Sequence, residues 1–144
     1  MALIVRRLDA GAELPSYAHA GDAGLDLAAR ESVTLGSRGG RAAVRTGLSM
    51  AIEAGYVGLV LPRSGLALHN GVTVLNAPGV IDSSFRGEVV VVLVNLDAVN
   101  DYAVRVGDRI AQLVIMPAAF QQVIEVAELP DSERGSLGLG ETGR

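Results

Sequence analysis

One turn in the sequence carries the residue types that chemistry needs. It lies between Gly79 and Gly87 and contains a carboxylate, Asp82, followed three residues later by an aromatic ring, Phe85. Residues 89–94 follow as an unbroken apolar run, which predicts a strand buried on both faces. A single acid and a single ring on a loop held by a buried strand indicate a functional site on a rigid base. The simpler alternative is a polar turn that contains aspartate only because turns favour it.

Two further segments combine polar side chains with strand ends. Residues 20–27 carry Asp22 and Asp26 around two glycines, and Asp26 either faces solvent at a strand end or is positioned to bind something. Arg63 and Ser64 follow a strand and begin a turn. They are either a surface cation and a turn hydroxyl or, with a helical turn behind them, a phosphate-binding group.

The remaining candidate site residues are an amide side chain and the C-terminal segment. Gln112 lies in the middle of an apolar segment and is either an outward-facing side chain or a buried amide that needs a partner. Arg134 opens a glycine-rich stretch, which is either a disordered tail or an arm that orders over a ligand with its amides directed at phosphate oxygens. His19 and His69 are interpreted as ordinary loop histidines.

Composition excludes several kinds of site. The chain of 144 residues has no cysteine and two histidines, which excludes disulfides and thiolate metal sites and argues against a protein-built zinc site. Its 12 basic residues are all arginines, scattered along a chain of net charge −4, which argues against stable nucleic-acid binding. Without lysine there is no Walker-type phosphate loop, so arginines and backbone amides must hold any polyphosphate.

The chain is apolar for its size. Its hydrophobic share is 49% and its mean hydropathy is +0.36, which indicates that much apolar surface is buried or is covered by a partner chain. The first residues do not resemble a signal peptide, and no apolar run approaches the roughly 18 residues that span a membrane. We therefore expect a cytoplasmic protein with no membrane segment.

Short apolar segments separated by glycine-rich turns predict a single all-β domain, a sandwich or barrel. Residues 64–70 are the only segment expected to form a helical turn or two. The predicted strands are residues 3–8, 25–29, 32–35, 42–46, 48–53, 56–62, 72–76, 89–94, 102–106, 108–117 and 121–129.

Taken together and in this order, the candidate segments resemble the five motifs of the trimeric dUTP pyrophosphatase (dUTPase) family. The five segments are AGDAGLDL (20–27), PRSG (62–65), GVIDSSFRGEV (79–89), GDRIAQLVI (107–115) and RGSLGLGETG (134–143). The resemblance implies a jelly-roll-like β domain over residues 1–133, a C-terminal arm over residues 134–144 that closes the active site, and assembly as a homotrimer. It also implies active sites shared by all three chains. The third motif would come from one chain, the first, second and fourth from another, and the arm from the last.

The resemblance further implies Mg²⁺-dependent hydrolysis of dUTP to dUMP and pyrophosphate, which limits uracil incorporation into DNA and supplies dUMP for dTMP synthesis. Asp82 would be the general base that activates water for attack on the α-phosphorus, and Asp26 an outer-shell partner of the metal through water. A hairpin from Asn76 to Ile81 would read uracil, and Phe85 would cover the deoxyribose. The remaining implied substrate-binding residues are Arg63, Ser64, Gly65, Gly79, Gln112, Arg134, Leu139, Gly140 and Thr142.

The motifs depart from the family pattern at two places. Phe85 stands where the family usually has tyrosine, and a ring can cover a sugar without its hydroxyl. In the fifth motif Leu139 stands in place of the usual base-stacking aromatic residue, and Leu137 and Glu141 replace a commoner glycine and a small hydroxyl residue.

Two other functions fit part of the pattern. A dCTP deaminase has a related strand core, but it needs an additional acid near the base, and residues 73–81 contain none. A non-catalytic trimeric nucleotide-binding module would not need Asp82 together with Arg63 and Gln112. The reaction products, or tight binding without turnover, distinguish these alternatives.

Overall fold

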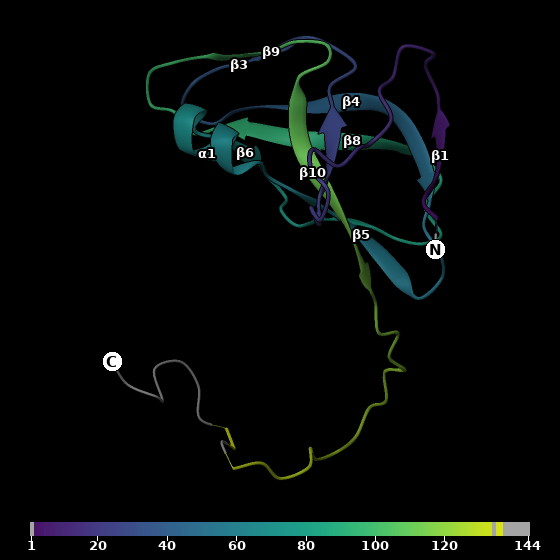
Figure 1. Ribbon diagram of the computed structural model, residues 1–144. Helices are drawn as coiled ribbons and strands as arrows, with labels where there is room; N and C mark the ends of the chain where they lie inside the picture. The colour runs from purple at the N-terminus through teal and green to yellow at the C-terminus, as the bar shows by residue number, and fades with distance from the viewer. Residues whose placement is uncertain (1, 134, 137–144) are drawn as a thin grey trace.

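Two four-stranded antiparallel sheets form the body of the fold, seen in a computed structural model that describes residues 2–133 and 135–136 (Figure 1). The first sheet has the order β1-β4-β8-β6, with β1 Ile4–Arg7, β4 Gly40–Ala51, β8 Glu88–Asn95 and β6 Val72–Val74. The second has the order β2-β10-β5-β7, with β2 Leu25–Ala28, β10 Arg109–Pro117, β5 Tyr56–Leu61 and β7 Gly79–Ile81. A small two-stranded sheet pairs β3 Val33–Leu35 with β9 Tyr102–Val104, and the helix α1 spans Ser64–Asn70.

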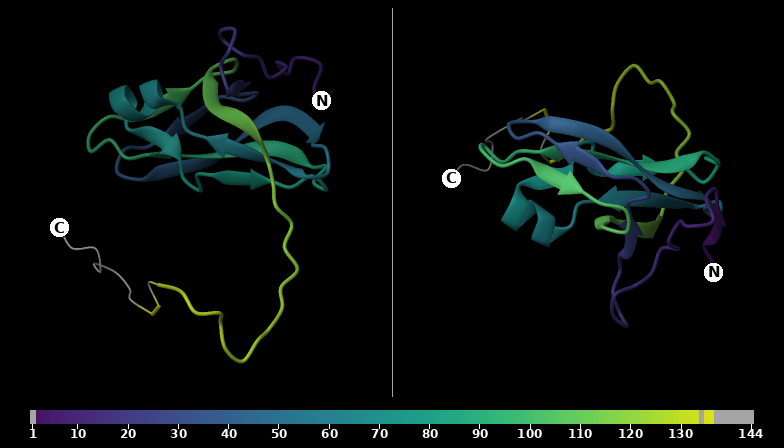
Figure 2. Two further views of the ribbon diagram at one scale, coloured as in Figure 1. Left: turned by 60° about the horizontal axis from the view of Figure 1, so that its bottom comes forward. Right: turned by 90° about the horizontal axis from the view of Figure 1, so that it is seen from above.

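The core lies between the two large sheets and is aliphatic. Leu27 and Leu113 from the second sheet and Val91 and Leu93 from the first are almost completely buried in one cluster. Their positions follow the two-residue repeat of strand side chains, which sends alternate residues to the core. Figure 2 shows the strands as stacked layers, with α1 and β1 toward opposite ends. The prediction of a mainly β domain with one short helical segment is confirmed.

The strand β8 corrects one prediction. Val89, Val91 and Leu93 are buried, whereas Val90 is 39% exposed and Val92 is half-buried. Residues 89–94 are therefore not buried on both faces in the single chain, because the other large sheet covers β8 on one side only. Val94, on the outward face of this apolar strand, is buried, so the chain itself leaves that face uncovered only around Val90 and Val92.

The long strand β4 corrects a second prediction. Two strands were predicted at residues 42–46 and 48–53, but a single strand, Gly40–Ala51, runs through both. Its register against β8 shifts between Arg45 and Ser49, as in a β-bulge. Gly47, which separates the two predicted strands, lies within this irregular region.

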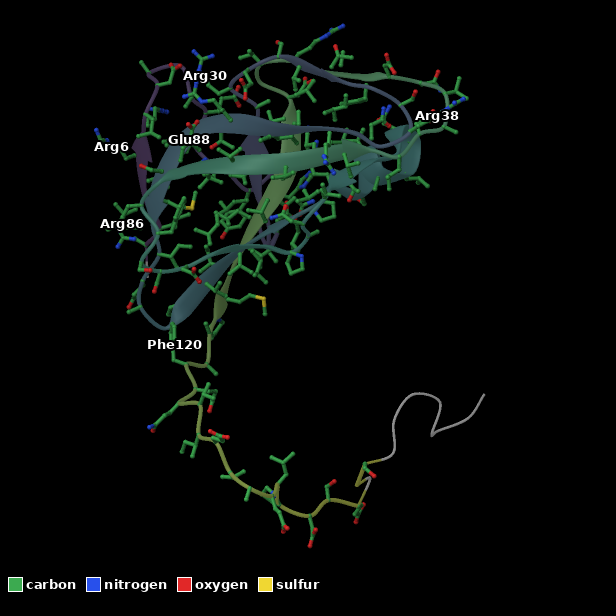
Figure 3. The ribbon with its side chains drawn as sticks, turned by 180° about the vertical axis from the view of Figure 1, so that it is seen from behind. Arg6, Arg30, Arg38, Arg86, Glu88 and Phe120 are labelled. Carbon is green, nitrogen blue, oxygen red and sulfur yellow. The ribbon has the colours of Figure 1, made fainter. Side chains whose placement is uncertain are left out.

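The segment after β10 is not a strand, although residues 121–129 were predicted to form one. Near its start the Ala118 N–H donates a hydrogen bond to Gly55 O at 2.8 Å. From there the chain extends away from both sheets, and Phe120 and Val123 are 73% and 95% exposed (Figures 1 and 3). A strand needs a hydrogen-bonding neighbour, and no strand in the described part of the chain pairs with this segment.

The described residues contain no helix that is long and apolar enough to cross a membrane.

Candidate active site

A cavity of about 270 Å³ lies beside the turn that follows β7, and we call it the turn cavity. Among its lining residues are Asn76, Gly79, Ile81, Asp82 and Phe85, all of them predicted site residues. The rest of its wall is apolar apart from Glu88: Val60, Val74, Val80 and Val89 through Val92. Five of the predicted residues therefore meet in one mostly apolar cavity that has a carboxylate and an aromatic ring on its wall.

Asn76, on the wall of the turn cavity, lies in a crossing, where the chain passes from one large sheet to the other. Val74 pairs with Leu93 of β8 in the first sheet, and Gly79 pairs with Val60 of β5 in the second. Residues 75–78 connect the two, so β6 and β7 do not form the hairpin that was predicted from Asn76 to Ile81. The pairing with two different sheets fixes both ends of the crossing.

Asp82 begins the turn immediately after β7, and its side chain is exposed. Its backbone oxygen accepts a 3.0 Å hydrogen bond from the Phe85 N–H, which closes the turn. Within residues 2–133 and 135–136 its carboxylate has no hydrogen-bond or ion-pair partner, so both oxygens can accept a proton or a hydrogen bond from an incoming group.

The same turn is held from within by Arg86. One guanidinium nitrogen, Nη1, donates to Ser83 O and to Phe85 O, both at 2.7 Å. These bonds cap carbonyls that point away from the sheet ladders, and they restrict the backbone on either side of Phe85.

Glu88 supports the far end of the turn and was missed by the sequence analysis. Its carboxylate accepts hydrogen bonds from Arg45 Nε at 3.0 Å and from the Gly47 N–H at 2.8 Å. The hydrogen bond and attraction from Glu88 raise the pKa of the Arg45 guanidinium. Figure 3 shows Glu88 and Arg86 toward the same end of the molecule. The only signal in the sequence was its place between a glycine and an apolar run, which is also a common place for a solvated acid.

A second cavity of about 510 Å³ collects the charged candidates, and we call it the charged cavity. Asp26, Arg63 and Gln112 line it together with Arg109, His19 and Asp22. Strand register brings the first three together, because Gln112 of β10 pairs with Asp26 of β2 on one side and with Leu61 of β5 on the other. Arg63 follows two residues after Leu61.

The carboxylate of Asp26 joins two arginines in the charged cavity. Its Oδ1 lies 3.4 Å from Arg63 Nε and its Oδ2 lies 3.2 Å from Arg109 Nη1, and the Asp26 side chain is only 13% exposed. Arg63 Nη1 also donates to Arg109 O at 2.8 Å. Asp26 therefore does not face solvent at a strand end, and its role in binding a ligand stays a prediction. Arg109 was missed, although it stands three residues before Gln112 in the same motif.

Gln112 is half-buried and lies across Gly24. A Cβ at residue 24 would be 2.5 Å from Gln112 Oε1 and 3.2 Å from its Cβ, so a side chain there would displace the amide. The glycine of the first motif thus makes room for the glutamine of the fourth.

Ser64 and Gly65 are the exposed first two residues of α1. Arg63 precedes them with extended backbone angles and gives the helix no side-chain cap, because a guanidinium has no acceptor for the first N–H groups. Ser64 and Gly65 follow directly in the chain after Arg63, which lines the charged cavity.

The two cavities have no lining residue in common. In the single chain, Asp82 and Phe85 therefore belong to a different cavity from Asp26, Arg63 and Gln112. The predicted residues of the fifth motif, Arg134, Leu139, Gly140 and Thr142, lie outside the described residues.

A metal site built by side chains alone is absent from the described part of the chain, where no group of three or more His, Asp or Glu residues could hold an ion. Asp26 does fit an outer-shell role. Mg²⁺ keeps several of its waters, and a carboxylate that lines the charged cavity can accept hydrogen bonds from them.

Comparisons with known proteins show the family of the chain. The family model described as dUTPase matches residues 10–143. The deoxyuridine 5'-triphosphate nucleotidohydrolase of Leifsonia xyli subsp. xyli is 51% identical over 130 residues, which cover 90% of this chain and 85% of that protein.

Two solved structures are similar over nearly the whole chain. The dUTPase of Staphylococcus bacteriophage 80alpha with dUPNHPP has a TM-score of 0.88 at 28% identity and covers 99% of each chain. A mutant dUTPase from phage phi11 of S. aureus, described as revealing the coordination of a structural Mg(II) ion, has a TM-score of 0.80 at 27% identity and covers 91% of this chain and 100% of that one. From the matching family model and the identity to a curated relative over most of both sequences, the chain belongs to the dUTPase family.

Proposed function

We propose that this protein hydrolyses dUTP to dUMP and pyrophosphate at sites shared between the subunits of a homotrimer. The observation that carries the proposal is the division of the site residues between two cavities. One has the apolar wall, the ring and the free carboxylate, and the other has the cations. A nucleoside triphosphate has an apolar base and sugar at one end and a polyanion at the other, so it needs both. If the cavities of neighbouring subunits face each other, one substrate can occupy both.

The turn cavity is suited to the nucleoside. Its volume of about 270 Å³ is near the lower end of small-molecule sites, roughly 300 Å³. Asn76 supplies an amide that can donate to and accept from a base edge, as can the backbone of the crossing from residue 75 to Ile81. Phe85 covers the sugar and leaves no room for a 2′-hydroxyl.

Asp82 is the general base in this proposal. Its carboxylate accepts a proton from a water that attacks the α-phosphorus, and pyrophosphate leaves on the opposite side. The exposed position at the start of the turn allows a water to approach within hydrogen-bond distance, about 2.6–3.2 Å.

The charged cavity holds the phosphates. Arg63, Arg109, Gln112, Ser64 and the Gly65 amide supply donors, and phosphoryl transfer is accelerated mainly by positioning and by cations. Asp26 would hold a Mg²⁺ ion through hydrogen bonds from its waters, and such an ion would supply positive charge that stabilises the triphosphate. Because Asp26 already joins two guanidinium groups, it also keeps both arginines oriented before substrate arrives.

The trimer is supported by apolar surface that the single chain leaves uncovered. Val90 on the outward face of β8 is exposed, and so are Phe120, Val123, Ile124 and Leu129 of the segment after Pro117. Contact with neighbouring subunits would bury them. In this proposal residues 1–133 form a jelly-roll-like domain, and residues 134–144 form the arm in which Arg134 and Gly140 contact phosphates and Leu139 covers the base with Thr142 beside it.

The reaction is tested with purified protein, dUTP, dCTP, dTTP and UTP, with and without Mg²⁺. Pyrophosphate and dUMP from dUTP alone are the expected products. Ammonia and dUTP from dCTP would identify a deaminase, and tight dUTP binding without turnover would identify a binding module.

The shared site is tested by mixing two inactive variants, Asp82→Asn and Arg63→Ala, under conditions that exchange subunits. If Asp82 and Arg63 of one site come from different subunits, random assembly restores about one quarter of the sites. If both come from the same subunit, the mixture stays inactive.

A further inference from the structure

The ring of Phe85 lies directly on the backbone of Gly87. A Cβ at residue 87 would be 2.6 Å from Phe85 Cζ, 2.9 Å from Cε2 and 3.5 Å from Cε1. Phe85 stands two residues before Gly87, so its ring folds back over the turn to make this contact. Only glycine leaves the space that the ring occupies.

The backbone around this contact is held on both sides. Arg86 Nη1 donates to Ser83 O and Phe85 O, and the Phe85 N–H donates to Asp82 O. On the other side Glu88 is bound to Arg45 and to the Gly47 amide. The turn therefore cannot easily open to make room for a larger residue 87.

The ring, by contrast, can move. Phe85 is 42% exposed, and the atoms nearest to residue 87 are at the far end of its side chain. Gly87 is not among the glycines with a positive φ, so an alanine there does not strain the backbone. The physical effect of a methyl group at residue 87 is thus to rotate the ring away from its place on the wall of the turn cavity.

We propose that Gly87 is a specificity-determining position, because its missing side chain seats the Phe85 ring in the one orientation that covers a deoxyribose. The proposal rests on the proposed function, in which Phe85 leaves no room for a 2′-hydroxyl. Gly87 touches no substrate and acts only through the ring, so it is a positioning residue. A displaced ring leaves Asp82 and the charged cavity intact but opens space beside the sugar.

The test measures kcat/KM for dUTP and for UTP in the full-length protein with the variants Gly87→Ala, Phe85→Ala and the double variant. We expect Gly87→Ala to lower the dUTP/UTP ratio about tenfold or more, the scale on which a pocket distinguishes one small group. In the Phe85→Ala background the same change should alter the ratio by less than about twofold, because the atoms it displaces are gone. Gly36→Ala is the matched control, since its Cβ would meet only Asp101 Oδ1, at 4.0 Å.

Each other outcome overturns the inference. An unchanged ratio in Gly87→Ala means that the ring seat does not set specificity, and an equal loss in both backgrounds means that residue 87 acts without the ring. If Gly87→Ala does not fold, removal of the ring in the double variant should restore folding, and failure to do so excludes the contact as the cause. A parent protein that does not hydrolyse dUTP refutes the proposed function, whereas an active parent with an unchanged ratio in Gly87→Ala refutes this inference alone.

Discussion

The turn cavity and the charged cavity are held in place by different forces. The crossing of the turn cavity is fixed by backbone pairing, with Val74 on Leu93 in one sheet and Gly79 on Val60 in the other. The charged cavity depends on side chains, because one carboxylate, Asp26, orients both of its arginines. Backbone ladders survive the loss of a single side chain, whereas an ion-pair cluster does not.

This difference predicts that substitutions in the two cavities should have different kinds of effect. A change in the turn cavity should remove one chemical role and leave the rest of the site in place. A change at the centre of the charged cavity should disturb several groups at once, since the Asp26 carboxylate is the ion-pair partner of both Arg63 and Arg109.

Asp82→Asn should have the largest effect and should be confined to chemistry. The amide cannot take the proton of the attacking water, so kcat should fall by about 10²–10⁴-fold. The side chain is exposed, and the described residues give it no hydrogen-bond partner, so dUTP affinity and melting temperature should hardly change. Pyrophosphate release and calorimetric titration measure the two properties separately. Turnover near the parent rate would remove Asp82 from the role of base.

Asp26→Asn should disturb several functions together. A neutral amide no longer balances Arg63 and Arg109, and it is a poorer acceptor for metal-bound water. We expect activity to fall about 10–100-fold, the usual cost of losing an outer-shell partner, with a rise in the Mg²⁺ concentration that gives half-maximal rate. Asp101→Asn is the control, because its oxygen only accepts the Ser37 N–H at 2.8 Å, which an amide oxygen can also do. An unchanged Mg²⁺ requirement would argue against the metal role.

Glu88→Gln tests whether the turn cavity is supported by backbone alone. The amide keeps the shape of the carboxylate but weakens the charge-assisted bond from the Gly47 N–H, so the free energy of unfolding should fall by about 1–2 kcal/mol. Urea denaturation measures it, with the exposed Glu53→Gln as the control. A loss no larger than in the control would show that backbone pairing suffices.

The sequence predicted what depends on local pattern. The apolar alternation marked most strands, and residues 64–70 form the only helix of the described residues, with Leu66, Ala67 and Leu68 as good helix formers and Gly71 as its left-handed C-cap. The motifs also identified Asp82, Phe85, Asp26, Arg63 and Gln112 as cavity residues.

What depends on pairing between distant residues could not be read from the sequence. Residues 121–129 have the pattern of a strand, yet no neighbour pairs with them within the described chain. The ion pair of Arg109 with Asp26 joins positions 83 residues apart and exists only through the register of β2 against β10. The hairpin predicted at residues 76–81 was wrong for the same reason. The two ends of this segment pair with strands of different sheets, β8 and β5, and such pairing cannot be read from local sequence.

Asp97 lines neither cavity, so its substitution should have the smallest effect and serves as a baseline for the other variants. Asp97 Oδ1 accepts the N–H groups of Asn100 at 2.7 Å and Val99 at 2.8 Å, and these bonds hold its pKa below the ordinary value of 3.8. A lowered folded-state pKa means that the carboxylate adds stability above pH 3.8 and that this part is lost as the pH falls through the folded-state value. Asp97→Asn keeps an oxygen acceptor but cannot titrate. Its melting temperature should therefore fall less steeply than that of the parent as the pH is lowered from 5 to 2, about the range in which an aspartate titrates. Activity at neutral pH should be unchanged. Parallel melting curves for the two proteins across this range would show that the Asp97 bonds do not contribute, and a loss of dUTP hydrolysis would show that the loop after β8 reaches one of the two cavities.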